Sequence, residues 1–372
     1  MSTPLVSVII PNYNHARFLE KRIQSVLDQT FQDLEVIILD DASTDNSREI
    51  IEGYRSHPKV VHIEYNESNG GTPFKQWNKG VRLARGAYIW IAESDDYADE
   101  RFLEVMVSHL DFDPQLGLVN CQSWIVDDQD RVTGLYPRYS GNDRWTYSYR
   151  NNGQNECENF LISSCTIPNA SAVLCRRDAY LNTGQANESF QECGDWWMWV
   201  KILMVSDICF IAQPLNYFRS HATNQTKKFK GTTQWFVEQL EVVGYICSKG
   251  SVALSIQESV LRDLVDRFIS LRLNNKPAPA AMGPSGAQIL QEIKRRTPGF
   301  IEEIADQHYW RQSYSTALRL YGLSGEYPGT TYSCHLKRLL LQLGQPGIVM
   351  RAASQSIKRV GRKMLLAPRV TR

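Results

Sequence analysis

The stretch YIWIAESDDY, residues 88–97, ends an apolar run abruptly at a group of carboxylates. The run is short, follows Gly86, and is rich in aromatic and β-branched side chains, which predicts a buried strand. Glu93, Asp95 and Asp96 fall at or just past its carboxyl end. Ligands of open α/β sheets bind at that edge. A solvated turn is the alternative, because Ser-Asp-Asp is ordinary turn chemistry.

Strands and helices alternate in the sequence that precedes this stretch. Buried strands are predicted at residues 5–10, 34–39 and 60–65, with helices after each of them, the last at 73–84. In the first helix the apolar residues recur at helical spacing, and Arg17, Glu20, Lys21 and Arg22 are expected to face solvent. This alternation predicts a doubly wound, mostly parallel α/β sheet. Asp40 and Asp41 end one of its strands, so they should open onto the same crevice as Asp95 and Asp96.

Three regions are predicted along the chain. Residues 1–230 form the first domain, with strands at 118–122 and 172–177, a polar and aromatic loop at 136–155, and a helix beginning near 191. Residues 231–330 read as a helical domain with a Pro- and Gly-rich linker at 274–286. Residues 331–372 form a basic amphipathic tail. The predicted fold is therefore α/β, followed by a C-terminal helical region.

Composition excludes several classes of protein. The net charge of +1 argues against a general nucleic-acid-binding protein. Residues 331–372 contain nine Lys and Arg and no Asp or Glu, so the rest of the chain carries −8. No signal peptide or apolar stretch long enough to span a bilayer is found, and the eight cysteines are irregularly spaced. We therefore expect a cytoplasmic protein with reduced thiols.

The acidic residues predict a cation site. Carboxylate oxygens suit Mg²⁺ or Mn²⁺, which proteins hold with one or two carboxylates and the phosphates of a substrate. Neither of the glycine-rich phosphate-binding motifs occurs in the sequence. Asp195 stands apart, next to Trp196, Trp197 and Trp199. Apolar surroundings raise a carboxyl pKa and suit a general base, and aromatic rings suit sugar faces. The alternative is an acid that stabilises a helix N-terminus beside core tryptophans.

Five motifs together resemble the family-two inverting glycosyltransferases of the GT-A fold. They are VSVIIPNYN at 6–14, SVLDQTF at 25–31, DDASTDNS at 40–47, NKG with ARGAYI at 78–89, and the pair Asp95-Asp96. The resemblance covers residues 5–225. Two departures are Ser94, where no acid precedes the pair, and the segment TPFKQW at 72–77.

The resemblance implies a role for each matching residue. Pro11, Tyr13 and Asp41 would hold the nucleotide base, with Asp41 accepting from pyrimidine N3 and Asp95 near the ribose. Asp96, and His221 with it, would bind the Mn²⁺ or Mg²⁺ that bridges the diphosphate. Asp195 would be the catalytic base. The remaining assignments, to the diphosphate or the acceptor, are Arg219 and Trp196.

The expected activity is metal-dependent inverting transfer of a sugar from a nucleotide sugar, UDP-linked by preference and dTDP-linked next. The acceptor would be a hydroxyl of a glycan or glycolipid, in cell-surface polysaccharide synthesis. The basic tail, residues 336–372, is expected to dock on an anionic membrane surface at its cytoplasmic face, or else to be a solvated terminus. A sugar nucleotidyltransferase and a catalytically silent carbohydrate-binding or scaffold protein are the alternatives.

Overall fold

A computed structural model of the chain divides it into two units, Met1–Val260 and Leu261–Arg372. The structure describes residues 3–136, 143–167, 169–221 and 233–253, together with 255–257, 259–260, 263–264 and 267. The first unit carries the fold described below. The expected linker at 274–286 and the expected tail lie outside the described residues.

A single ten-stranded sheet forms the centre of the first unit, in the order β3-β2-β1-β4-β9-β6-β10-β5, with β7 paired to β6 and β8 paired to β10. β1, β2, β3 and β4 run parallel to their neighbours in that group, as do β6 and β10. The strands are β1 Val6–Asn12, β2 Leu34–Asp40, β3 Val60–Tyr65, β4 Tyr88–Ile91, β5 Tyr97–Ala98, β6 Leu116–Val126, β7 Val132–Tyr136, β8 Tyr149–Asn151, β9 Val173–Arg176 and β10 Asp207–Arg219.

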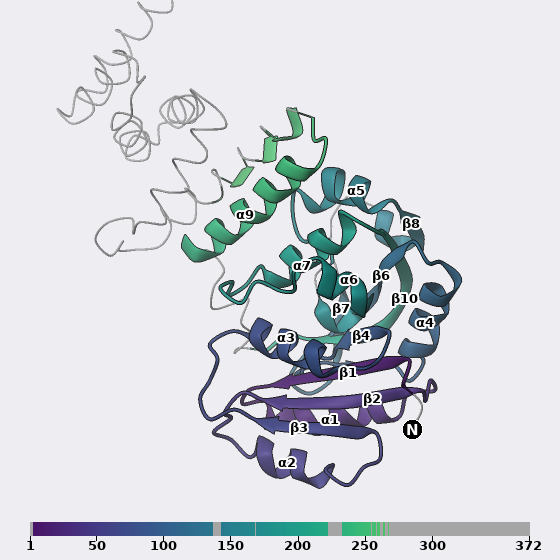
Figure 1. Ribbon diagram of the computed structural model, residues 1–372, viewed down its shortest axis with the longest axis vertical. Coiled ribbons are helices and arrows are strands. Elements are labelled where there is room, and N and C mark those ends of the chain that lie inside the picture. Colours follow the sequence, from purple (N-terminus) through teal and green to yellow (C-terminus); the bar gives the residue numbers. More distant parts are fainter. Residues whose placement is uncertain are drawn as a thin grey trace, which may run out of the picture. The chain divides into compact units, whose positions relative to one another are not determined.

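Helices lie on both faces of this sheet (Figure 1). The helices are α1 Ala16–Leu27, α2 Ser47–Gly53, α3 Pro73–Leu83, α4 Phe102–Phe112, α5 Gly153–Glu156, α6 Arg177–Asn182, α7 Gly194–Leu203 and α9 Thr233–Lys249. Short 3-10 or π-helical turns occupy Arg144–Thr146, Cys157–Leu161 and Ala170–Ala172. The expected α/β fold is therefore confirmed. Within the described residues no helix has the length and apolarity that crossing a membrane requires.

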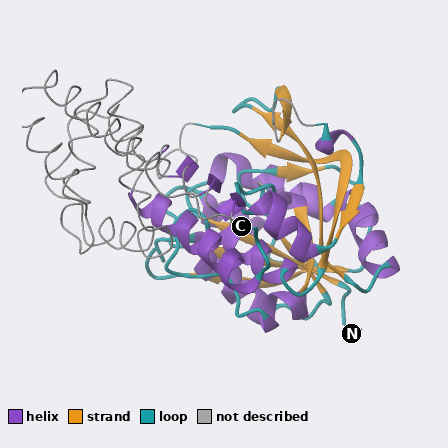
Figure 2. Cartoon of the chain, turned by 90° about the horizontal axis from the view of Figure 1, so that it is seen from above, coloured by secondary structure: helices purple, strands orange, loops and turns teal. Residues whose placement is uncertain are grey.

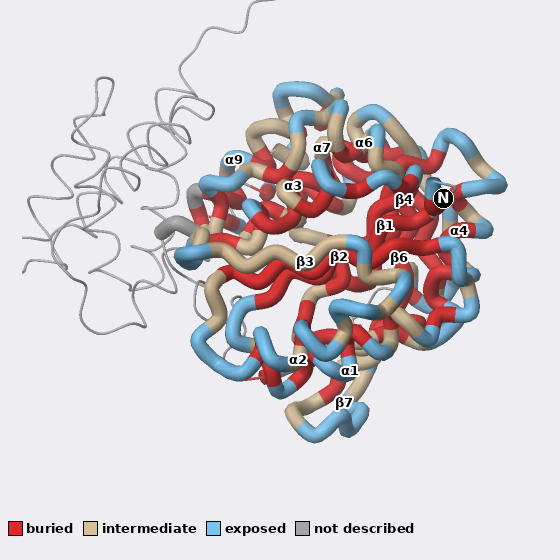
Figure 3. Tube along the Cα trace, turned by 60° about the horizontal axis from the view of Figure 1, so that its bottom comes forward, coloured by how far each residue is buried: buried red, intermediate tan, exposed pale blue. Residues whose placement is uncertain are grey.

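Successive side chains along each strand point to opposite faces of the sheet, so a strand can contact helices on both sides. In β1, Val8 and Ile10 belong to the main core cluster with Leu19 of α1, and the residue between them, Ile9, faces α3. A Cβ on Gly80 would stand 2.4 Å from Ile9 Cγ2, so α3 approaches the sheet closely only because that position is glycine. Figure 3 shows that β1, β2 and β4 are buried along their lengths.

The second half of the sheet differs from the expectation. Part of the loop expected at 136–155 is instead the strand β8, which pairs with β10. β10 itself was not foreseen, since Pro214 interrupts its apolar sequence and prolines demote a run as a strand. The register between β10 and β6 shifts on both sides of Pro214, so the strand accommodates the proline as an irregularity. Figure 2 shows the strands of the sheet in orange, with purple helices around them.

Pairing between β5 and β10 determines where the acidic pair lies. β5 runs antiparallel to the end of β10, with Tyr97 opposite Tyr217. The two tyrosine rings stack with centroids 4.4 Å apart. Asp95 and Asp96, just before β5, are thereby placed beside Arg219 and His221, which follow Tyr217.

Candidate active site

The carboxyl ends of β1, β2 and β4 meet at one edge of the sheet. Asn12, the last residue of β1, lies opposite Asp40 of β2, and Ile9 lies opposite Ile91 of β4. Asp41 follows β2 and Asp95 follows β4, so the expected convergence of the two acidic pairs on one edge agrees with the register. Asp40 stabilises the turn that follows β2. Its carboxylate accepts hydrogen bonds from Asn12 Nδ2 at 2.7 Å and from Ser43 Oγ at 2.6 Å.

Asp41 is held rigidly at this edge. Its side chain is buried, and Oδ1 accepts from Asn66 Nδ2 at 2.6 Å and Gln76 Nε2 at 2.7 Å. The backbone N–H of Gly70 donates to both carboxylate oxygens, with an N–Oδ2 distance of 2.9 Å. Among described residues Oδ2 accepts from Gly70 alone, which leaves it the capacity to accept from a ligand. Gln76 lies in the divergent segment 72–77, so that departure supplies a contact to Asp41.

Pro11 and Tyr13 lie at the end of β1, on the same edge. Pro11 is buried, whereas the side chain of Tyr13 is 41% exposed. An exposed aromatic ring at the edge of the sheet where Asp41 also lies is a suitable platform for a planar nucleotide base. Their nucleotide-binding roles stay predictions.

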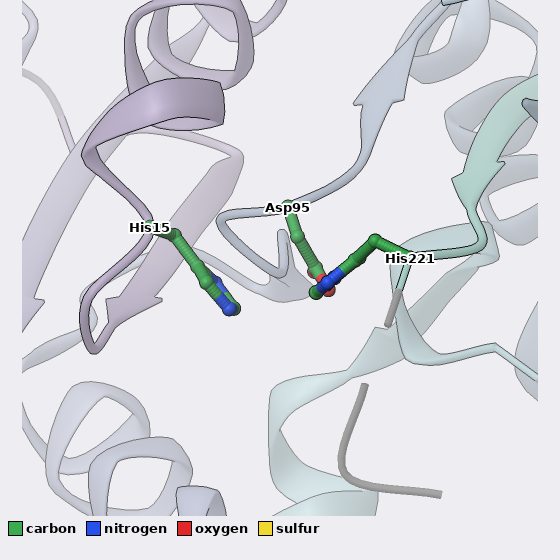
Figure 4. Close-up of side chains that lie close together, drawn as sticks. All are labelled: His15, Asp95 and His221. Atoms are coloured by element: carbon green, nitrogen blue, oxygen red, sulfur yellow. The ribbon is translucent and has the colours of Figure 1, made fainter. Parts of the chain in front are cut away.

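Asp95 lies in a cluster with two histidines. His221 Nε2 is 2.9 Å from Asp95 Oδ2, and the side chains are 4% and 17% exposed. His15, the residue before α1, brings a ring nitrogen to the same place, and the ligand atoms of all three residues lie within 4.8 Å of one another. Figure 4 shows the three side chains directed toward one another from separate segments. The sequence identified two of these residues and missed His15.

Asp96 takes a different position. Its Oδ1 accepts the backbone N–H of Arg219 at 2.8 Å, and the side chain is buried. Burial and the neighbouring charge of Asp95 raise the pKa of Asp96 to about 7. The guanidinium of Arg219 donates to the carbonyls of Asp95 and Asp127, both at 2.8 Å. The structure thus brings Asp95 together with His221, and it brings Asp96 together with the backbone of Arg219.

Arg22 and Glu93 lie close enough to Asp95 and Asp96 to interact with their charges. The expectation that Arg22 faces solvent is wrong: its side chain is 0% exposed, and Nε donates to the Glu93 carbonyl at 2.8 Å. Both Nη atoms of Arg22 lack a hydrogen-bond partner among the described residues. Glu93 accepts from Trp77 Nε1 at 2.7 Å, and burial, with Asp95 nearby, raises its pKa to about 8. A buried cation beside three carboxylates offsets part of their mutual repulsion.

Asp195 occupies the first turn of α7. Burial is the main reason its pKa is raised to about 7, and the charges of Glu192 and Glu238 raise it further. Oδ1 accepts the backbone N–H of Trp196 at 2.6 Å. A carboxyl group with this pKa is suited to proton transfer near neutral pH. Trp196 itself is 3% exposed and packs in the interior, so its role as an acceptor platform stays a prediction.

Helix α9 fastens the start of α7. Glu238 of α9 is 0% exposed, and its carboxylate accepts the backbone N–H groups of Gln191, Glu192 and Cys193 at 2.7, 2.9 and 2.8 Å. Trp197 packs against Tyr245 of α9 with ring centroids 5.0 Å apart and the ring planes tilted by 57°. The region expected to form a separate helical domain therefore begins with a helix that packs onto the segment carrying Asp195.

The side chains present at the edge fit a divalent cation. His15, Asp95 and His221 combine two imidazole nitrogens with a carboxylate oxygen, a donor set that Mn²⁺ and similar ions accept. Asp96 is adjacent, and its assignment as a ligand stays a prediction. The three donors come from the ends of β1, β4 and β10, so one folded sheet preorganises them.

Known proteins resemble this chain in sequence and in fold. The family model described as glycosyl transferase family 2 matches residues 7–178. The glycosyltransferase GlyG of Streptococcus pneumoniae serotype 4 is 33% identical over 153 residues, which are 41% of this chain and 46% of GlyG. Chondroitin synthase of Escherichia coli is 38% identical over 130 residues, 35% of this chain and 18% of that protein. The matched segments thus span less than half of these curated relatives.

Fold similarity extends further along the chain. The crystal structure of S. aureus TarS 1–349 in complex with UDP-GlcNAc aligns with a TM-score of 0.61 at 17% identity, covering 94% of this chain and 92% of that one. At that identity the likeness concerns the fold alone. The family match and this fold agree on the same sheet: residues 7–178 match the model of glycosyl transferase family 2, and the described fold is the GT-A fold.

Proposed function

We propose that this protein transfers a sugar, with inversion, from a nucleotide-diphosphate sugar to a hydroxyl of a glycan or lipid-linked glycan. UDP is the preferred nucleotide and dTDP the next. The observation that carries this proposal is the contact between Asp95 and His221 at the carboxyl end of β4, on the same edge of the sheet as Asp41. Cell-surface polysaccharide synthesis is the proposed setting, and the chondroitin synthase relative supports it.

Asp41 and the residues around it would bind the base. Asn66, Gly70 and Gln76 fix the carboxylate in one orientation. A carboxylate oxygen of Asp41 in this orientation favours a nucleobase that presents a ring N–H, as uracil and thymine do at N3. Such a site discriminates strongly against nucleobases without this N–H, because the buried carboxylate oxygen would then be left without a hydrogen bond.

Asp95 and His221 would hold the divalent cation, with Asp96, the ligand expected from the resemblance, next to Asp95 in the chain. The contact expected between Asp95 and the ribose stays a prediction. A bound cation supplies positive charge that stabilises the departing nucleoside diphosphate. Arg219 keeps the acidic turn in place through its contacts with the carbonyl of Asp95 and the carboxylate of Asp96. The protein would therefore bind and orient the diphosphate from a preorganised turn.

Asp195 would accept the proton of the acceptor hydroxyl. The bond from the acceptor oxygen to the anomeric carbon forms as the bond to the diphosphate oxygen breaks, and the electron pair leaves with the nucleoside diphosphate. Attack opposite the leaving group inverts the anomeric carbon. A single displacement of this kind requires one base and no enzyme nucleophile.

A comparison of nucleotides and two variants tests this proposal. Among UDP, dTDP, CDP, GDP and ADP, we expect UDP to raise the melting temperature most, and only with a divalent cation present. Asp195→Asn should keep that UDP-dependent shift and lose sugar transfer from a panel of UDP-sugars. Asp178→Asn is the matched control, since its Oδ1 also accepts from the next residue at the start of a helix. Metal-independent UDP binding, or full transfer by Asp195→Asn, would contradict the proposal.

Localisation is also part of the proposal. The nine basic residues of 331–372 would attract an anionic surface on the cytoplasmic face of a membrane, where a lipid-linked acceptor lies. This segment lies outside the described residues, so the sequence alone supports the idea.

A further inference from the structure

We infer that His15 is a third protein ligand of the cation site, and that the site therefore selects Mn²⁺ or a similar transition ion over Mg²⁺. This inference rests on the proposed function, which places a divalent cation at Asp95 and His221. It adds a residue and a metal preference that the Asp95-Asp96 pair does not itself require.

The first argument is placement. His15 lies on the turn between β1 and α1, and β1 is the parallel neighbour of β4, which Asp95 follows. The rings of His15 and His221 stand perpendicular with centroids 5.7 Å apart, and a nitrogen of each lies within 4.8 Å of the other and of a carboxylate oxygen of Asp95. Donor atoms at these separations can reach a common ion with small side-chain adjustments, because M–N and M–O bonds are about 2.0–2.2 Å long.

The second argument is orientation. Ser94 Oγ lies 2.8 Å from His15 Nδ1, and Ser94 is itself 1% exposed. A metal-ligating histidine characteristically hydrogen-bonds through its other nitrogen to an oxygen of the protein, which fixes the ring and its tautomer. An imidazole that donates from Nδ1 to Ser94 carries its lone pair on Nε2. Ser94, the position where no acid precedes the pair, is thus the partner that would orient His15.

The third argument is packing around the imidazoles. Phe18, one turn into α1, lies 5.3 Å from the His221 ring and 6.3 Å from the His15 ring, centroid to centroid. An apolar ring beside a cation site lowers the local dielectric and strengthens the ligand–cation interaction. The two histidines are therefore held by the fold and do not hang in solvent.

The metal preference follows from ligand chemistry. Mg²⁺ takes oxygen ligands and retains several waters, whereas imidazole nitrogen favours transition ions. Two imidazoles and one carboxylate form a set typical of first-row transition ions such as Fe²⁺, and Mn²⁺ accepts the same ligands. A site with only carboxylates and one histidine would discriminate less between Mn²⁺ and Mg²⁺.

Direct metal titration tests the inference without relying on activity. Mn²⁺ binding by the full-length protein, with saturating UDP, is measured from the electron paramagnetic resonance signal of free Mn²⁺, and Mg²⁺ affinity by competition. We expect His15→Ala to weaken Mn²⁺ binding at least tenfold and to lower the Mn²⁺/Mg²⁺ affinity ratio by a similar factor. Ser94→Ala, which keeps the ligand and removes its partner, should weaken Mn²⁺ binding by a smaller factor. His62→Ala, which alters a histidine on β3, should change neither value.

The outcomes separate this inference from the proposed function. Wild-type Mn²⁺ affinity and selectivity in both His15→Ala and Ser94→Ala, with loss of binding in Asp95→Asn, would overturn the role of His15 and leave the proposed function standing. No Mn²⁺ binding by the wild-type protein with UDP would overturn both. Should His15→Ala fail to fold, as judged by its circular dichroism, the Ser94→Ala result decides, because unchanged Mn²⁺ affinity in that variant contradicts the orienting contact.

Discussion

Asp195 is the side chain whose protonation state the proposed chemistry depends on. Burial raises its pKa to about 7, and the charges of Glu192 and Glu238 raise it further. The same burial has a thermodynamic consequence. The folded protein retains the proton up to pH 7, whereas the unfolded chain loses it near pH 4.

Two pH dependences follow for Asp195. Below about pH 7, kcat/KM should fall tenfold per pH unit, because the base must be ionised to accept a proton. The free energy of unfolding should decrease as pH rises from about 4 to about 7, since the unfolded state binds fewer protons in that range. Urea denaturation across this range compares wild type with Asp195→Asn, in which that contribution to the slope should vanish. An unchanged slope in the variant would show that Asp195 ionises normally.

At the residue level the sequence predicted the acids better than their partners. Asp41, Asp95, Asp96 and Asp195 were found because carboxylates after strands, or beside tryptophans, stand out in a pattern. His15 was missed because its neighbours in the cluster are 80 and about 200 positions away. Arg22 was misassigned because helical periodicity assumes that a charged residue faces water, and here the acids after β4 supply a buried partner charge.

At the level of elements, the sequence predicted the strands that a local pattern defines, and it missed two strands that depend on long-range pairing. The alternating strands and helices up to β4 were predicted closely, since each apolar run is short, continuous and bounded by turns. β8 and β10 were not, because β8 has three residues and β10 contains a proline. β10 is a strand through its pairing with β6 and β5, and β8 through its pairing with β10. That half of the sheet carries His221 and Arg219, so the site's geometry was beyond local reasoning.

Helix α9 should matter for catalysis through Glu238. Glu238→Ala would leave three backbone N–H groups at the start of α7 without their acceptor, at about 1–3 kcal/mol for each that stays buried. We expect a loss of stability of about 2–4 kcal/mol in urea denaturation and a fall in kcat greater than the change in KM for the donor. Glu238→Gln keeps one acceptor oxygen and should recover part of both losses.

The matched control lies on the same helix. Glu241→Ala alters an exposed residue one turn further along α9 and should leave stability within about 0.5 kcal/mol of wild type. If Glu238→Ala lowered stability with kcat unchanged, α9 would be a packing element without influence on Asp195.

At the scale of the whole molecule, the family match ends at residue 178, whereas the compact unit continues to Val260. Asp195, His221 and α9 all lie beyond that match. The segment 331–372 adds nine positive charges to a chain whose remainder carries −8. We propose that this segment attracts an anionic membrane surface.

Vesicle co-sedimentation tests the role of that segment. Full-length protein should bind vesicles that contain anionic lipid more strongly than residues 1–330 do, with about 1 kcal/mol from each Lys or Arg near the surface. Raising the salt concentration should weaken the binding, and vesicles of neutral lipid alone serve as the control. Equal binding of the two proteins would contradict a role for residues 331–372 in membrane binding.

The cluster of His15, Asp95 and His221 joins the turn after β1 to the end of β10, about 200 positions later in the chain. An ion held there would be a reversible cross-link that closes a very long loop. Contacts of such sequence separation form late in folding, so the ion should slow unfolding and leave the refolding rate unchanged. Stopped-flow denaturant jumps with and without Mn²⁺ measure both rates, and faster refolding would contradict this order of events. The cation would then govern not only turnover but also how long the enzyme remains folded.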